Sequence, residues 1–326
     1  MKTRLPKITL SCFFLAFSFI GYGQSEVFSR STVTTGNWGD AQLPWFYDSA
    51  DRGDPDYNNT QPLRIRIGHN NNTNMTLNGR TYRAKELVFQ AGASSNRTFG
   101  GNILDLRYNS GGPTKIENLS TGTHTFNNSI AIFDGVSQFN PVDGDLVFNA
   151  TVFNNGNFID VFGDNGHTIQ FNNINGSGGL AVKQNSIVEI TGTNTYTGNT
   201  VVEAGTLDIT ASGSLSTSTQ VSVRSGAEVI IRNNQELNVL IVDAGGTVRV
   251  VPGAILKVNT TLTNNGTIIF ESDASGSAQF DEFTGTLSGT GDFTVERYMS
   301  DNRAFRLVSS PVTTTDFIAN NWQQNT

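Results

Sequence analysis

Apolar and polar residues alternate along most of the chain at the spacing of β-strands. Leu63-Arg-Ile-Arg-Ile67 alternates without a break, which predicts a half-buried strand with Arg64 and Arg66 pointing outward. Similar short runs continue almost to Val295, separated by turns rich in Gly, Asn and Asp. No window carries apolar residues at helical spacing, and the turns are too frequent for a helix to persist. The pattern predicts an all-β chain.

A glycine-centred unit recurs in the second half of the chain. A short β-rich run, a glycine turn and a second β-rich run surround each of four glycines, which lie 21, 20 and 20 positions apart: Gly205, Gly226, Gly246 and Gly266. A fixed period of about 20 residues is typical of repeat architectures. We expect these glycines to form the turns of the repeat, and Asn residues at other turns to form side-chain amide ladders.

Two all-β architectures fit short strands at this period, a series of β-sandwiches and a parallel β-solenoid. The fixed glycine period favours the solenoid, because sandwich strands vary in spacing and orientation. We predict a right-handed parallel β-helix over residues 63–294, with neighbouring coils about 4.7–4.9 Å apart. At a repeat of ~20 residues this span gives ~11–12 coils.

The N-terminus carries the features of a secretory signal. A basic segment precedes the 13-residue apolar run Ile8–Ile20, which is shorter than the roughly 20 residues that a membrane span needs. We therefore predict a cleaved signal peptide over residues 1–23 and no membrane span elsewhere. The only cysteine, Cys12, lies in this run, so the mature protein would contain no disulfide.

The segments beside the repeat differ from it in composition. Residues 24–62 contain the aromatic cluster Pro44-Trp-Phe-Tyr47, which we interpret as an irregular N-terminal cap over the open end of the stack. A sugar-stacking platform is the alternative. Residues 295–326 form the start of an incomplete C-terminal segment.

The composition supports an exported β protein and argues against nucleic acid as a partner. Only 15% of the residues are charged, and Gly accounts for 34 of 326. The formal net charge is -7, which lacks the basic surface that nucleic-acid binding requires.

One stretch resembles a known repeat family. In order along the chain it carries Gly176-Ser-Gly-Gly-Leu180, then Ile190-Thr-Gly-Thr-Asn-Thr-Tyr-Thr-Gly-Asn-Thr200, then Val202-Glu-Ala-Gly-Thr-Leu207. These segments belong to a stretch of about 40 residues, running on to Leu215, that resembles the autotransporter-associated β-strand repeat. The resemblance implies a right-handed β-helical passenger on a bacterial surface. Only one full copy is present, and the neighbouring units keep the glycine pattern alone.

Two further stretches are similar to surface proteins of the Bacteroidota. They are Thr35-Gly-Asn-Trp-Gly-Asp40 and the segment from Val295 to Gln323. In such proteins the second segment usually leads to further domains and a C-terminal signal for the type IX pathway. The resemblance implies a secreted or surface protein, with the type IX secretion machinery as a partner if a full-length form carries that signal.

A cluster of aspartates is the position where a metal would be expected. It comprises Asp48, Asp51, Asp54 and Asp56, whose oxygens could hold Ca²⁺. Their spacing fits neither an EF-hand nor the nonapeptide calcium repeat, so the sequence favours a solvated acidic loop and no cofactor. The tripeptide Arg52-Gly-Asp54, which integrins bind in some proteins, is explained by composition.

Catalytic signatures are weak throughout. The three histidines are 43–55 residues apart and show no zinc-binding spacing: His69, His124 and His167. Three arginines are expected on the outside of the repeat without a carboxylate cluster at coil spacing beside them: Arg224, Arg232 and Arg249. Three glutamates are spread at most one per coil: Glu189, Glu203 and Glu228. We expect no catalytic residues.

The sequence therefore predicts an adhesin-like structural module on the cell surface, whose polar faces contact glycans or other surfaces. The alternative is a polysaccharide lyase or hydrolase on the same scaffold. Recurring Asp and Glu pairs on one face of neighbouring coils would favour the enzyme.

Overall fold

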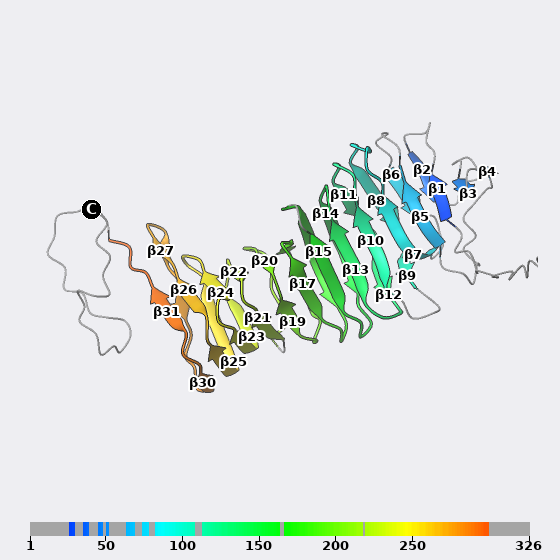
Figure 1. Cartoon of the computed structure of the whole chain (residues 1–326). Helices are drawn as coiled ribbons and strands as arrows, with labels where there is room; N and C mark the ends of the chain where they lie inside the picture. Colours follow the sequence, from blue (N-terminus) through cyan, green and yellow to red (C-terminus); the bar gives the residue numbers. More distant parts are fainter. Residues whose placement is uncertain are drawn as a thin grey trace, which may run out of the picture.

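The computed structural model describes residues 26–29, 35–38, 45–47, 50–51, 63–68, 74–77, 82–107, 113–163, 166–217 and 219–299. Over these ranges the chain is all-β without a helix, and its strands stack as a parallel β-solenoid of about ten turns. Of the 31 described strands, 29 form one continuous hydrogen-bonded system that runs along the length of the molecule (Figure 1). The predicted parallel β-helix is confirmed, whereas residues 1–23 lie outside the described ranges.

Each coil presents three faces, which we name A, B and C in chain order. Face A contains β1 (Glu26–Ser29), β5 (Leu63–Ile67), the end of β7 (Tyr82–Phe89), β10 (Thr114–Asn118), β13 (Ser137–Pro141), β15 (Ile159–Gly163), β17 (Leu180–Gln184), β19 (Thr200–Val202), β21 (Gln220–Val223), the ends of β23 (Gln235–Val242) and β25 (Ile255–Asn264), and β30 (Thr286–Ser288). Face B contains β2 (Thr35–Trp38), β6 (Asn74–Leu77), β8 (Arg97–Gly101), β11 (His124–Phe126), the starts of β14 (Leu146–Phe153) and β16 (Thr168–Asn175), β18 (Ile187–Ile190), β20 (Gly205–Ile209), β22 (Ala227–Ile231), β24 (Thr247–Val250), β26 (Thr267–Phe270) and β31 (Asp292–Val295). Face C contains the start of β7, β9 (Leu104–Leu106), β12 (Ile130–Ile132), the ends of β14 and β16, the starts of β23 and β25, and β29 (Gln279–Phe280).

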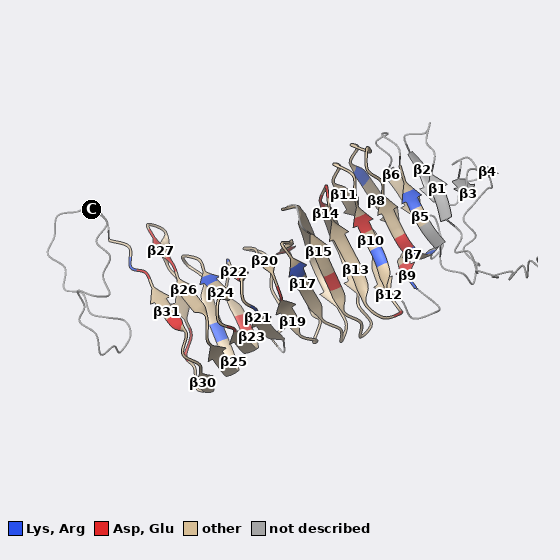
Figure 2. Ribbon diagram, in the orientation of Figure 1, with Lys and Arg blue, Asp and Glu red and all other residues tan. Residues whose placement is uncertain are grey.

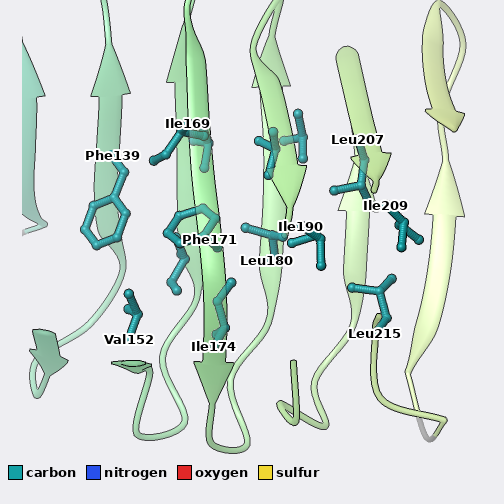
Figure 3. Close-up of a cluster of buried hydrophobic side chains, with 14 of the residues drawn as sticks. Phe139, Val152, Ile169, Phe171, Ile174, Leu180, Ile190, Leu207, Ile209 and Leu215 are labelled. Atoms are coloured by element: carbon teal, nitrogen blue, oxygen red, sulfur yellow. The ribbon is translucent and has the colours of Figure 1, made fainter. Parts of the chain in front are cut away.

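Parallel pairing in register places equivalent side chains in columns inside the solenoid. On face B, four phenylalanine rings stack with centroids 4.8, 4.8 and 5.3 Å apart: Phe99, Phe126, Phe148 and Phe171. Offset stacking of this kind stabilises the core beyond the area it buries. Figure 3 shows the column continuing with Ile190 and Ile209, whose side chains point into the interior. The alternation in the sequence thus becomes a continuous core.

Face C lacks regular strands in the middle of the solenoid, and buried amides replace the missing pairing there. Asn194 Oδ1 accepts a hydrogen bond from the backbone nitrogen of Ile174 at 2.7 Å. Two coils further, Gln235 Oε1 accepts one from the backbone nitrogen of Leu215 at 3.0 Å. An unpaired buried N–H group is costly, so these side chains are needed where the ladder lapses. Tyr196 fills the adjacent core, and its hydroxyl lies 2.5 Å from Thr200 Oγ1.

The stack begins within the predicted cap region. Strands β1 and β2 pair in parallel with β5 and β6. Strand β3 (Trp45–Tyr47) then pairs antiparallel with β1, and β4 (Ala50–Asp51) pairs antiparallel with β3. The antiparallel strand occupies the edge of β1 that a further coil would otherwise use. A second short hairpin, β27 (Ser272–Asp273) with β28 (Gly276–Ser277), stands apart from the main sheet.

Coil lengths vary more than the glycine period indicates. Val182 pairs with Val202, 20 residues later, whereas Leu87 pairs with Ile116, 29 residues later. These longer coils toward the N-terminus explain why the solenoid has about ten turns instead of the predicted ~11–12.

The four predicted turn glycines all lie at the corner between faces A and B. Gly205 is paired with Ala227, and the same register position is occupied by Gly246 and Gly266 in the next coils. Gly226 lies one residue earlier, where its nitrogen donates to the carbonyl of Gly245. Gly205 and Gly226 have left-handed φ values of 83° and 79°. Gly246 and Gly266 lack left-handed φ, and what they require is space, since a Cβ on Gly266 would meet the carbonyl oxygen of Asp243 at 2.5 Å.

Two of these glycines form a matched pair for mutation. We expect Gly226→Ala to cost about 1–2 kcal/mol, because its φ is left-handed but no atom lies within 4 Å of the added Cβ. Gly205→Ala adds a collision with the backbone of Ser186, whose nitrogen would lie 2.8 Å from the Cβ. It should cost at least ~2 kcal/mol more in urea unfolding. Equal losses for the two variants would contradict this account of the corner.

Candidate functional site

Carboxylates from neighbouring coils meet on the outer surface of face B. Gln170 pairs with Glu189, and Glu189 pairs with Asp208, so the three side chains form one outward column. The expectation that no carboxylate cluster recurs at coil spacing beside the outer arginines was therefore wrong for Glu189 and Asp208, since Asp208 is paired with Arg232. The signal was their separation of 19 positions, which a search at a strict 20-residue period misses. We name Gln170, Glu189, Asp208, Arg232 and Arg249 the face-B strip.

Each acidic group of the face-B strip is already engaged by a neighbour. Glu189 Oε2 accepts a hydrogen bond from Gln170 Nε2 at 2.7 Å. Both oxygens of Asp208 accept from Arg232 Nε, at 2.8 and 2.9 Å. This hydrogen bond raises the pKa of Arg232 above its ordinary value. Both carboxylates therefore already have hydrogen-bond partners in a neighbouring coil.

Arg249 links two further acidic residues on the same face. Its guanidinium hydrogen-bonds to Glu271 Oε1, and this contact raises the pKa of Arg249. Its Nη1 lies 3.7 Å from Glu228 Oε1. All three predicted outer arginines therefore carry ion pairs, since Arg224 Nη1 also lies 2.7 Å from Asp243 Oδ2.

Face A carries a second charged column with alternating sign. It consists of Lys183, Glu203, Arg224 and Asp243, which the backbone hydrogen bonds place in successive coils. Lys183 Nζ also contacts Asp160 Oδ2 at 2.8 Å and lies 3.9 Å from Glu203 Oε1. Figure 2 shows charges of both signs dispersed along the rod in this view, without a large patch of one sign. The outer surface is largely self-neutralised.

A serine and a histidine meet inside the solenoid. Ser120 Oγ lies 2.8 Å from His124 Nε2, and both side chains are fully buried. The Ser120 hydroxyl donates to Asn118 Oδ1 at 2.7 Å, so the histidine ring must be the donor in the Ser120–His124 contact. A nucleophilic serine requires the opposite arrangement, with its proton directed to the histidine and its oxygen open to substrate. This pair is structural.

The surroundings of His124 favour its neutral form. Its ring stacks on Phe89 with centroids 3.6 Å apart. Burial, together with the smaller effect of the positive charge of Arg97, lowers the pKa of His124 to about 3. Nδ1 is buried and has no hydrogen-bond partner, consistent with a neutral ring protonated at Nε2.

The other residues singled out by sequence are placed only in part. Asp51 lies in β4, and Asp48, Asp54 and Asp56 lie outside the described residues, as does His69. His167 Nδ1 lies 3.6 Å from Asp145 Oδ1 at a half-exposed corner. The described part of the chain holds no group of three His, Cys, Asp or Glu side chains that could bind a metal ion. It also contains no helix long and apolar enough to cross a membrane.

Comparison with known proteins gave no match: neither the family models, nor the curated proteins, nor the solved structures contain a significant counterpart of this chain.

Protonation of His124 should make stability pH-dependent. The folded-state pKa of about 3 lies below the roughly 6.5 of an unfolded histidine, so the unfolded state binds more protons between these values. Stability should therefore fall as the pH drops below about 6.5, on the order of a few kcal/mol in total. We expect His124→Phe, which keeps a ring on Phe89, to lose less stability than the parent between pH 7.5 and 5.0 in urea unfolding. His167→Gln is the control for the loss of a histidine at a corner of the solenoid; an unchanged slope in His124→Phe would contradict the assignment.

Proposed function

We propose that this chain is an exported cell-surface module, an adhesin-like β-helical rod whose polar faces contact glycans or other surfaces. The observation that carries the proposal is that the acidic side chains in the outer columns are already paired. Their acidic groups on faces A and B are joined to Arg, Lys or Gln of neighbouring coils. A surface of this kind offers many hydrogen bonds but few reactive groups. No cofactor is required for such a role.

Export is the second part of the proposal. It rests on the basic and apolar segments of residues 1–23, and on the resemblance of residues 176–207 to the autotransporter-associated repeat. The similarity to Bacteroidota surface proteins favours the type IX machinery as the export partner of a full-length form. The localisation that follows is extracellular or at the outer cell surface.

A binding experiment tests the contact role. The purified protein should be retained in gels that contain soluble polysaccharides and should adhere to cells that display them, while the polysaccharide keeps its length. Retention measured by affinity electrophoresis, with reducing ends counted in parallel, gives both readouts. Absence of retention on every polysaccharide and every cell surface would refute the adhesive role.

One observation favours a second candidate, a polysaccharide-active enzyme. Glu189 and Asp208 occupy adjacent coils, and strand spacing sets their backbones about 4.8 Å apart. Retaining glycosidases place two carboxyl groups about 5–5.5 Å apart. The engagement of Asp208 by Arg232 and of Glu189 by Gln170 argues against it.

The enzyme candidate makes a distinct prediction. If it holds, the parent releases reducing ends from a polysaccharide, and Glu189→Gln and Asp208→Asn each lower that rate by at least about a hundredfold. Glu203→Gln, a carboxylate of face A, should leave the rate unchanged. We expect no release from the parent, and a rate that depends on Glu189 and Asp208 would replace the structural proposal by the enzymatic one.

A further inference from the structure

A shallow pocket opens on the outer surface of face A. Five uncharged side chains from three adjacent coils line it: Gln138 and Asn140 of β13, Val142 just after β13, Phe162 of β15 and Gln184 of β17. It encloses about 260 Å³, below the roughly 300–1,000 Å³ of drug-sized ligand sites, so it suits a single small ring. We name these five residues the face-A pocket.

Phe162 is unusual for its position. In parallel β15–β17 pairing it stands beside Lys183, in the outward column of face A. The described members of that column from residue 66 to residue 243 include one aromatic side chain, and it is this one: Arg66, Val88, Glu117, Asn140, Phe162, Lys183, Glu203, Arg224 and Asp243. A single outward apolar residue needs no function by itself. The indication of a ligand comes from the amide side chains that line the pocket beside Phe162.

Two amides lie beside the ring, one with an unused acceptor and one at the corner between faces A and B, where Gly205 also has a left-handed φ. Asn140 donates from Nδ2 to Glu117 Oε1 at 3.3 Å, while its Oδ1 is buried and accepts no hydrogen bond from the protein. Gln184 has a φ of 57°, a left-handed conformation that is strained for a residue other than glycine. Its side chain is exposed at the edge of the pocket. An acceptor without a donor and a strained residue meet at one site.

The electrostatics of the pocket select a neutral ligand. Lys183 is the nearest cation, with Nζ 5.3 Å from the centroid of the Phe162 ring. The same Nζ is held by Asp160 Oδ2 at 2.8 Å, which offsets its charge. The five side chains that line the pocket carry no charge. A charged ligand would thus find no uncompensated partner here.

We propose that the face-A pocket binds one ring of a neutral saccharide. An apolar C–H face of a sugar would stack on Phe162, because aromatic faces are negative and C–H groups are weakly positive. The sugar hydroxyls would exchange hydrogen bonds with Gln138 and Gln184, and with Asn140 Oδ1 after a rotation of its amide exposes that atom. Strand addition by a peptide is not an option on this face, since the backbone of β15 is already paired with β13 and β17. This inference rests on the proposed contact function and assigns it a site and a ligand class.

Affinity electrophoresis with defined polysaccharides tests the site. The probes are a neutral β-glucan, a neutral galactomannan and the anionic polygalacturonate, with the full chain and its variants. We expect retention by at least one neutral probe, and Phe162→Ala to weaken it about three- to tenfold, as the loss of one stacked ring would. Phe162→Trp should keep the retention. Phe158→Ala is the matched control, since Phe158 is an exposed phenylalanine that directly precedes the same strand and lies outside the pocket.

A second variant separates binding from folding. Gln184→Gly removes the amide and relieves the left-handed strain, so it should weaken retention while leaving the urea midpoint equal to or above that of the parent. Retention by a neutral probe that is unchanged in Phe162→Ala and Gln184→Gly would overturn the pocket while leaving the contact function intact. Binding to polygalacturonate alone, or adhesion to cells with no polysaccharide retained, would overturn the neutral-saccharide assignment.

Discussion

In-register parallel pairing between successive coils is the constraint on which the rest of this structure depends. It brings each residue about 4.8 Å from its equivalent in the next coil, inside and outside alike. Inside, that proximity is favourable, because Phe126 and Phe148 stack in parallel and aliphatic residues continue the same column. Outside, it would set like charges against each other, which is destabilising. The alternation of Lys183, Glu203, Arg224 and Asp243 avoids this cost and turns the same spacing into attraction.

In-register pairing also explains the polar residues in the segment that resembles the autotransporter-associated repeat, residues 176–207. In the two coils whose face-C segments are residues 193–197 and 211–217, that face has no regular strand, apart from a single bridge between Thr193 and Ser214. Asn194 and Gln235 supply acceptors for backbone N–H groups that the ladder leaves open, and Tyr196 fills the space between them and face A. Asn194 and Tyr196 of this segment thus stabilise the fold of this chain. The motif identifies an architecture, and its polar residues need no ligand to account for them.

Alternation and the glycine period were sufficient to predict the fold, since both follow directly from strand pairing. The period was not sufficient to predict register. Gly226 shares the spacing of the other turn glycines but lies one position out of line with Gly205, because coils differ in length by a residue or more. The same variation in coil length is the reason why the sequence did not predict the contact between Glu189 and Asp208. Phe162 could not be identified either, because one aromatic residue in a strand gives no indication of the face it occupies.

A rigid stack with paired charges is better suited to contact than to acid–base chemistry. A general acid or base must reach the substrate proton, and the carboxylates of Asp208 and Glu271 are already hydrogen-bonded to Arg232 and Arg249. Weak contact sites gain from rigidity, because one occupied site holds the next at a high effective concentration. For the rod proposed here, a single shallow pocket would bind one sugar ring weakly. It would contribute to adhesion because that ring is repeated along a polymer. The uncharged lining of the face-A pocket is compatible with that role, whereas ion pairs of face A, such as those of Lys183 and Arg224, hold neighbouring coils together.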